Sequence, residues 1–269
     1  MQYDPIKRKT AKVFNCCRSA RVMFYRLLDL LLLRSWYIRK EVKEWAGSAP
    51  ENARVLDAGS GFGQYVYYVS QLKGGFNVKG IDVKQEEVDI CNRFFREGNE
   101  GSRVLFENAD LTGFVEPDSY HLILCVDVLE HISEDVLVME NLCKSLKKGG
   151  MLIISTPSDQ GGSDVHESGD DSFIGEHVRD GYAVEEIEKK LQRAGFRRME
   201  SLYSYGKPGQ LSWKISMKYP IKMLNKGKIF FLVLPLYYLI TFPFALLLNL
   251  RDLRKKHKSG TGLIVKAIK

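Results

Sequence analysis

Three closely spaced glycines after a short apolar run are the first candidates for ligand chemistry. The run Val-Leu-Asp-Ala-Gly-Ser-Gly-Phe-Gly places them at Gly59, Gly61 and Gly63, two residues after Asp57. Glycine lets the backbone approach a ligand closely and adopt angles that other residues resist. A turn of this kind can also be purely structural, so the acidic residues around it decide its interpretation.

Acidic residues recur where the next two apolar runs end. Asp82 follows Asp57 by 25 residues, and a carboxylate at that place can hold both hydroxyls of a ribose. Asp110 ends the following run, where it could accept a hydrogen bond from an adenine amino group. Because ligands of open α/β sheets bind beyond the carboxyl ends of the strands, these acids are expected to lie near one another.

The elements that must position these residues alternate along the chain. Expected strands cover residues 54–58, 78–83, 104–108, 120–126, 151–155 and 198–205, and expected helices cover 64–71, 86–96, 135–146 and 184–194. A basic, helix-rich segment at about 18–45 precedes them, and residues 261–269 read as a final strand. The alternation predicts an α/β fold with a mostly parallel sheet and helices on both faces.

The three strand ends together resemble the cofactor site of class I S-adenosylmethionine-dependent methyltransferases. The resemblance covers about residues 54–205 and the last eight, and implies a Rossmann-like seven-stranded sheet that ends with an antiparallel strand. The cofactor would be S-adenosyl-L-methionine, leaving S-adenosyl-L-homocysteine as product. The implied cofactor-binding residues are Asp57, Gly59, Gly61, Gly63, Asp82, Val83, Asp110, Leu111 and Val126.

The resemblance also implies their roles. The glycines would pass beside the methionine part, Asp57 would help to fix its amino group, and Asp82 would bind the ribose. Asp110 and Leu111 would frame the adenine. A nicotinamide-dependent oxidoreductase is the alternative, but its G-x-G-x-x-G fingerprint fails because Gln64 or Val66 stands where the third glycine belongs.

A polar turn after the run 122–126 contains Asp127, Glu130 and His131. These residues could contact cofactor or substrate, transfer protons or form a divalent metal site. Similar E-x-x-E-H spacing holds a metal in the quinone O-methyltransferases, but Asp127 replaces the first Glu and many relatives carry the segment without metal. A metal is therefore not favoured, and His131 is a catalytic candidate or a helix-entry residue satisfied by its neighbours.

His177 is the second candidate for a general base. It follows a Ser-, Gly- and Asp-rich segment, residues 158–172, that could form a lid over the site or an ordinary solvated loop. Imidazole titrates near neutrality and can take a proton from a hydroxyl as it is methylated. A structural role for His177 is the alternative.

More than fifty residues separate the strand ending at 205 from the final strand. Residues 229–250 carry no charge. As a helix with a rise of about 1.5 Å per residue, this segment is long enough to cross the hydrocarbon core of a bilayer. A single crossing would leave the final strand on the wrong side of the membrane. Pro235 and Pro243 therefore favour a bent, re-entrant or surface-lying hairpin. A helical cap over the site or a dimer interface is the alternative.

Charge is distributed unevenly over the 269 residues. The first 50 carry 11 basic and 4 acidic residues, the last 63 carry 13 and 1, and the part between them has a net charge of −12. This pattern argues against a nucleic-acid footprint across the whole molecule and points to the two ends as contacts for an anionic surface. No nucleic-acid partner is expected.

The sequence thus predicts a basic helical segment (1–50), a methyltransferase core (51–206), a membrane-associating insertion (207–261) and a final core strand (262–269). Five cysteines without metal-like spacing indicate a reduced compartment, and no secretory signal is expected. We expect a peripheral or monotopic enzyme on the cytoplasmic face of a membrane that methylates a hydrophobic small molecule, such as a quinone, isoprenoid, polyene or other lipid-like compound, with O-methylation favoured. The alternatives are a non-catalytic membrane adaptor and a protein or nucleic-acid methyltransferase. The oligomeric state stays open.

Overall fold

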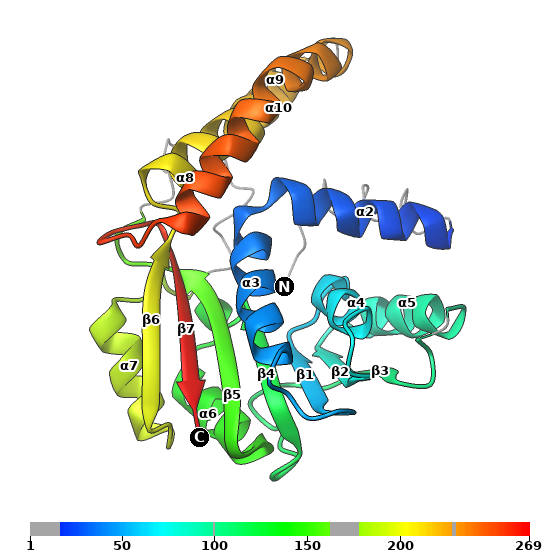
Figure 1. Cartoon of the computed structure of the whole chain (residues 1–269), viewed down its shortest axis with the longest axis vertical. Coiled ribbons are helices and arrows are strands. Elements are labelled where there is room, and N and C mark those ends of the chain that lie inside the picture. The colour runs from blue at the N-terminus through cyan, green and yellow to red at the C-terminus, as the bar shows by residue number, and fades with distance from the viewer. Residues whose placement is uncertain (1–16, 99, 162–177, 228–229) are drawn as a thin grey trace.

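One seven-stranded sheet organises the chain. The computed structural model describes residues 17–98, 100–161, 178–227 and 230–269. Its strands are β1 (Arg54–Ala58), β2 (Asn77–Asp82), β3 (Val104–Asn108), β4 (Tyr120–Val126), β5 (Leu146–Pro157), β6 (Arg198–Ser204) and β7 (Gly262–Ile268). Their order is β3-β2-β1-β4-β5-β7-β6, and β7 pairs antiparallel with both neighbours while the pairs among β1 to β5 are parallel. The expected Rossmann-like class I sheet is confirmed (Figure 1).

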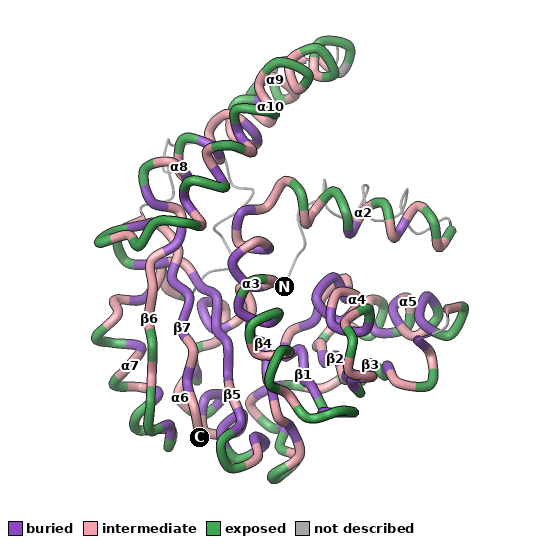
Figure 2. The backbone as a smooth tube through the Cα atoms, viewed as in Figure 1, coloured by how far each residue is buried: buried purple, intermediate pink, exposed green. Residues whose placement is uncertain are grey.

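Helices cover both faces of this sheet. The helices α4 (Gln64–Ser70) and α5 (Gln85–Arg96) share one apolar cluster with the N-terminal helices α2 (Arg18–Leu31) and α3 (Leu33–Ala46). On the other face, α6 (Asp135–Ser145) and α7 (Val184–Arg193) pack in a second cluster. The central strands β1, β4, β5 and β7 are buried along most of their length, whereas the outer strands β3 and β6 are more exposed (Figure 2).

Two local boundaries differ from the sequence-based expectation. The N-terminal helix-rich segment is divided because Leu32 takes an extended conformation between α2 and α3. Strand β5 starts at Leu146 instead of residue 151, since Leu146 pairs with Tyr120 before a register shift carries the pairing to Met151 and Leu122. Gly149 and Gly150 fall inside this irregular part of the strand.

A helical hairpin stands between β6 and β7. Its first leg comprises α8 (Lys207–Trp213), the short π-helix η2 (Lys214–Lys218) and α9 (Tyr219–Lys226), and its second leg is α10 (Phe230–Arg254). The expectation that Pro235 and Pro243 set the bend was wrong, because both lie inside the continuous helix α10. The chain reverses between α9 and α10, and both prolines lie within the second leg.

Hydrogen bonds between the two legs fix the hairpin. The Ser212 hydroxyl donates to the Ala245 carbonyl oxygen at 3.0 Å. Tyr237 and Tyr238 of α10 donate to the carbonyl oxygens of Ile215 and Ser216 at 2.7 and 2.8 Å. These acceptors lie in the π-helix, where the altered backbone pattern makes carbonyl groups available to the facing helix.

The fully buried carboxylate of Asp252 fastens the base of the hairpin to the core. It accepts hydrogen bonds from the Tyr37 hydroxyl of α3 at 2.7 Å and from the Gly209 backbone N–H of α8 at 2.9 Å. His257 Nε2 lies 3.2 Å from the same carboxylate. A side chain on Gly209 would collide with Asp252, so glycine is needed for this close approach. The hairpin therefore leaves the core from a fixed base.

Candidate cofactor and acceptor site

The turn after β1 is shaped by glycines. Gly59 has a φ of +81°, and a Cβ there would lie 2.3 Å from a methyl carbon of Val128. The backbone N–H groups of Gly59 and Ser60 both donate to the carbonyl oxygen of Ile81 in β2 at 2.8 Å. Positive φ and lack of space both require glycine at 59, and the paired hydrogen bonds hold the turn against the end of β2.

Gly61 and Gly63 serve the turn in different ways. Gly61, with a φ of +47°, has no heavy atom within 4 Å of the position that a Cβ would take, so space is open beside it. Gly63, with a φ of +75°, precedes α4, and a Cβ there would lie 2.9 Å from the Phe106 ring. Gly61 thus offers room for a ligand, whereas Gly63 permits packing against β3.

Asp82 meets this turn directly. One carboxylate oxygen accepts from the Gly61 backbone N–H at 2.9 Å, and the other accepts from the Lys84 backbone N–H at 2.9 Å. The side chain is half-buried at the end of β2. Two backbone donors therefore orient a carboxylate beside the open space at Gly61, as the binding of ribose hydroxyls would require.

Asp57 is a buried carboxylate at the base of the same turn. Its exposure is 1%, and its Oδ2 atom has no hydrogen-bond partner. Burial, with a further contribution from the charge of Asp82, raises the pKa of Asp57 to about 7. An uncompensated buried carboxylate is costly unless a cation or donor joins it. The ammonium group of an S-adenosyl ligand fits this requirement, so the residues present suit the cofactor.

The remaining expected cofactor residues lie along the same edge. Asp110 is exposed, and its Oδ1 accepts from the backbone N–H and the hydroxyl of Thr112 at 2.9 and 2.8 Å. Leu111 is buried, Val126 is half-buried at the end of β4, and Val83 is half exposed after β2. Their roles toward the cofactor stay predictions.

The turn after β4 carries an ion pair that no local pattern marks. Asp127, with a φ of +53°, pairs with Arg34 from the first turn of α3. The backbone N–H of Arg34 donates to the Tyr205 hydroxyl at 3.1 Å, and Tyr205 itself has a φ of +53°. Asp127 lies more than ninety positions after Arg34 in the sequence and Tyr205 lies more than seventy after Asp127, yet Arg34 contacts both. They meet near the glycine turn of residues 59–63, which we call the cofactor turn. Short sequence motifs cannot reveal such contacts.

Glu130 and His131 lie in the 3₁₀ turn η1 (Leu129–His131). The Glu130 carboxylate is buried and accepts from the Thr156 hydroxyl at 3.1 Å, and burial raises its pKa. With Asp127 paired to Arg34, no three metal-ligating side chains gather among the described residues. His131 is half-buried at the end of the turn, where it stays a candidate for proton transfer.

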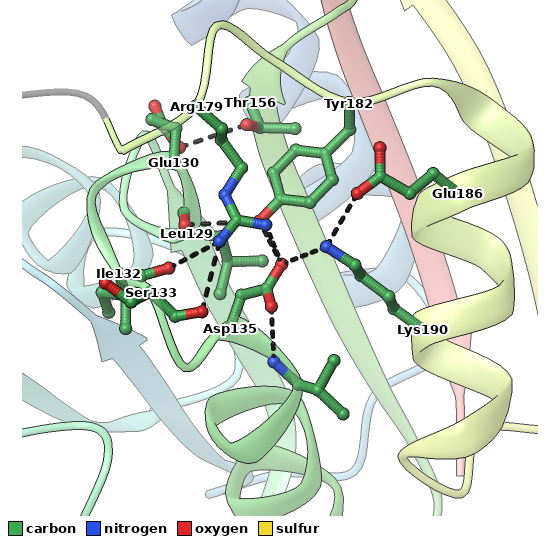
Figure 3. Close-up of polar contacts among 11 residues, drawn as sticks. Leu129, Glu130, Ile132, Ser133, Asp135, Thr156, Arg179, Tyr182, Glu186 and Lys190 are labelled. Carbon is green, nitrogen blue, oxygen red and sulfur yellow. Dashed lines mark hydrogen bonds and ion pairs between the residues drawn. The ribbon is translucent and has the colours of Figure 1, made fainter.

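His177 and most of the Ser/Gly/Asp-rich segment lie outside the described residues. The chain that follows is fastened to η1: the Val178 N–H donates to the Glu130 carbonyl oxygen at 3.0 Å. Figure 3 shows a polar cluster centred on buried Asp135. Its carboxylate pairs with Arg179 and Lys190 and accepts a hydrogen bond from the Tyr182 hydroxyl at 2.7 Å. Sequence reasoning missed this cluster because its members come from separate elements.

Comparison with known proteins agrees with this geometry. Residues 50–200 match the family model described as a methyltransferase domain. A ubiquinone biosynthesis O-methyltransferase of Rickettsia akari is 26% identical over 124 residues, 46% of this chain and 48% of that protein. The enzyme of the same name from Actinobacillus pleuropneumoniae serotype 7 is 27% identical over 130 residues, 46% and 52% of the two chains. The chain spans about half the length of these relatives.

Solved structures share the fold at low sequence identity. A phosphoethanolamine N-methyltransferase 2 of Haemonchus contortus in complex with S-adenosyl-L-methionine aligns with a TM-score of 0.62 at 17% identity, covering 94% of this chain and 57% of that one. The [4+2]-cyclase SpnF aligns with a TM-score of 0.56 at 21% identity, covering 87% and 80%. At these identities the likeness shows the fold alone.

The position of Asp82 predicts a large effect on cofactor binding. Asp82→Ala should weaken the binding of S-adenosyl-L-homocysteine by about a hundredfold, because two ribose hydrogen bonds to a charged acceptor are lost. Isothermal titration calorimetry measures the change, with exposed Asp118→Ala as the control that keeps the wild-type affinity. Unchanged affinity in a folded Asp82→Ala protein would discard the ribose assignment.

The raised pKa of Asp57 predicts a pH dependence. Below about pH 7 the carboxyl of the free protein is protonated, and a bound ammonium group favours the carboxylate, so binding releases a proton. Affinity for S-adenosyl-L-homocysteine should therefore rise about tenfold from about pH 6 to about pH 8. Asp57→Asn should bind weakly and lose this dependence.

The same pKa fixes the sign of the stability effect. A carboxyl whose pKa is higher in the folded than in the unfolded protein contributes stability at low pH that is lost as the pH rises through about 7. Without cofactor, Asp57→Asn should thus melt above wild type at about pH 8. Equal pH profiles for binding and melting in wild type and Asp57→Asn would refute the role of Asp57.

Proposed function

The chain belongs to the methyltransferase-domain family, and on this premise we propose that it transfers the methyl group of S-adenosyl-L-methionine to a hydrophobic small molecule taken from a membrane. The observation that carries the membrane part is the exposed apolar face of α10. The buried carboxylate of Asp57 and the open space beside Gly61 support the cofactor.

Helix α10 leaves an unusually large apolar surface in contact with solvent. The stretch Leu232–Arg254 is long and apolar enough to cross a membrane, yet only 11% of its apolar window is buried (Figure 2). The exposed large apolar side chains are Leu232, Val233, Leu236, Leu239, Ile240, Phe244, Leu247 and Leu250. Contiguous apolar surface of this kind marks a contact with protein or membrane, and the charges around it favour the membrane.

The first leg of the hairpin argues that the hairpin lies along the bilayer surface instead of crossing it. The first leg carries a lysine every four residues in η2 and α9, at Lys214, Lys218 and Lys222. Because of this spacing, the three lysines lie on one side of the leg. If α10 crossed the hydrocarbon, this leg would have to cross with it, at a cost of about 3 kcal/mol for each lysine at the bilayer centre. At the interface, the same lysines reach the head groups while α10 buries its apolar face.

The base of the hairpin adds cations of the same kind. Arg251, Arg254, Lys255 and Lys256 are exposed at the end of α10 and just after it. Basic residues beside an apolar helix attract anionic lipids, each contributing about 1 kcal/mol near the surface. An anionic bilayer, here the cytoplasmic face of a membrane, thus complements the whole hairpin in both polarity and charge.

The acceptor would enter beside this surface. The hairpin begins and ends at the carboxyl edge of the sheet, where Gly262 pairs with Ser204 and Pro157. The ubiquinone-biosynthesis relatives support a hydroxyl group on a quinone-like isoprenoid as the acceptor. Methyl transfer from a sulfonium needs the hydroxyl oxygen in line with the methyl carbon, so positioning and exclusion of water dominate. His131 and His177 are the candidates for taking the hydroxyl proton.

The test measures both the binding of the protein to vesicles and the transfer of labelled methyl groups. Wild-type protein should sediment with vesicles that contain phosphatidylglycerol and transfer label from methyl-labelled S-adenosyl-L-methionine into the organic extract of bacterial membranes. Leu236→Glu with Leu239→Glu should reduce vesicle binding and labelling at least about tenfold, because two charges enter the apolar face. Its affinity for S-adenosyl-L-homocysteine should stay unchanged.

A matched control separates membrane contact from general damage. Leu105→Glu with Val115→Glu places two charges on exposed apolar residues away from the hairpin and should behave as wild type. Vesicle binding by the hairpin double variant equal to wild type would contradict the membrane proposal, and a change of wild-type dimer to monomer would favour a dimer interface. Cofactor binding without label in any extract would favour a non-catalytic adaptor.

A further inference from the structure

Helix α2 holds the middle of the cofactor turn with its inner face. The Tyr25 hydroxyl and Arg21 Nη2 both donate to the Phe62 carbonyl oxygen, at 2.6 and 2.8 Å. Arg21 Nε also donates to the Tyr25 hydroxyl oxygen at 2.7 Å, so the two side chains act together. Phe62 lies between Gly61 and Gly63, and the position of α2 therefore bears on the turn that receives the cofactor.

The outer face of the same helix is apolar and exposed. Met23, Leu27 and Leu30 are 52%, 39% and 40% exposed and follow one another at the spacing of a single helical face. The exposed Arg26 lies among them. The helix is thus amphipathic: polar and aromatic side chains on its inner face contact the core, and apolar side chains on its outer face are exposed to solvent.

Helix α2 is held mainly by polar contacts, with little burial. Only Arg21 and Tyr25 of its 14 residues are buried. Arg18, at its start, pairs with Glu100 at 2.7 Å and donates to the Phe94 carbonyl oxygen at 2.8 Å. A helix with so little burial belongs to the parts of a protein that open at low free-energy cost. A partner on the outer face would hold it in place.

Charge and position identify this partner as an anionic bilayer. Helix α2 carries three arginines and one aspartate, and a basic amphipathic helix binds at the interface of anionic membranes. Figure 1 shows α2 and the hairpin of α8 to α10 on the same side of the molecule, beyond the carboxyl ends of the parallel strands. A membrane that receives the hairpin is therefore near the outer face of α2.

We propose that α2 is a second membrane contact and that bilayer binding to its outer face strengthens cofactor binding through Arg21, Tyr25 and the Phe62 carbonyl. This inference rests on the proposed membrane function. A bilayer that binds the docked helix favours the turn that α2 supports, and cofactor binding must in return strengthen membrane binding by the same factor. The enzyme then binds its cofactor most tightly at the membrane, where its acceptor is found.

The experiment measures the affinity of the full chain for S-adenosyl-L-homocysteine by calorimetry, with and without vesicles of phosphatidylcholine and phosphatidylglycerol. Vesicles should lower the Kd of the wild-type protein about fivefold or more. Vesicles of phosphatidylcholine alone should have less effect, because the basic residues contribute through anionic head groups.

Two variants examine the two faces of α2. Met23→Glu with Leu27→Glu should keep the vesicle-free Kd and still sediment with vesicles through the hairpin, but the Kd should no longer respond to vesicles. Tyr25→Phe removes one hydrogen bond to Phe62 and should reduce the response without affecting sedimentation. Leu105→Glu with Val115→Glu carries the same charges elsewhere and should respond as wild type.

The outcomes separate this inference from the proposed function. Wild-type protein that sediments with vesicles but keeps its Kd would overturn the coupling and leave the membrane function standing. A full vesicle response in Met23→Glu with Leu27→Glu would overturn the assignment of the outer face. Wild-type protein that binds no vesicles would overturn the membrane function and this inference with it.

Discussion

The antiparallel pairing of β7 between β5 and β6 is the constraint on which the molecule depends. Seven residues of β7 pair with each neighbour, from Gly262 to Ile268. Because β5 and β6 end at the same edge of the sheet, everything inserted between β6 and β7 must leave and return there. The topology itself therefore places the hairpin at the same edge of the sheet as the glycine turn, and both of its ends stay on one side of any membrane that it meets.

Unfavourable local features gather at this edge. Asp127 and Tyr205 have positive φ, which side chains other than glycine resist, and Asp57 is a buried carboxylate with an unpartnered oxygen. Strained backbone and uncompensated charge lower stability, and they persist at functional sites where the surrounding structure enforces them. By contrast, the buried carboxylates of Asp252 at the hairpin base and Asp135 at the start of α6 each have several hydrogen-bond or ion-pair partners.

The sequence predicted the features that depend on local patterns. The glycines, Asp57 and Asp82 were found because each lies at a strand end that hydrophobic periodicity identifies, and the sheet brings Gly61 and Asp82 into contact as expected. Pro235 and Pro243 misled because proline predicts a break from local chemistry alone, whereas the first leg of the hairpin packs along α10 and the helix continues. The start of β5 was also predicted too late, at residue 151 instead of Leu146.

Contacts between distant segments were beyond local reasoning. Arg34 and Asp127, or Arg21 and Phe62, meet only because α2 and α3 fold over the carboxyl edge of the sheet. Each residue is unremarkable in its own stretch of sequence, and only the packed fold shows which partner it meets. The site thus combines the cofactor turn, which local sequence patterns predict, with N-terminal helices whose contacts to that turn they do not predict.

A lipid-directed photo-cross-link can show directly whether the hairpin lies on a bilayer. A benzophenone side chain in place of Leu239, which is 75% exposed near the middle of α10, reports what covers the apolar face of the hairpin in the presence of anionic vesicles. A hairpin that lies on the bilayer gives adducts with phospholipid acyl chains, whereas a benzophenone placed at exposed Leu105 gives none. Adducts with a second copy of the chain, or none with lipid while the protein is otherwise folded and binds cofactor, would contradict the proposed membrane contact.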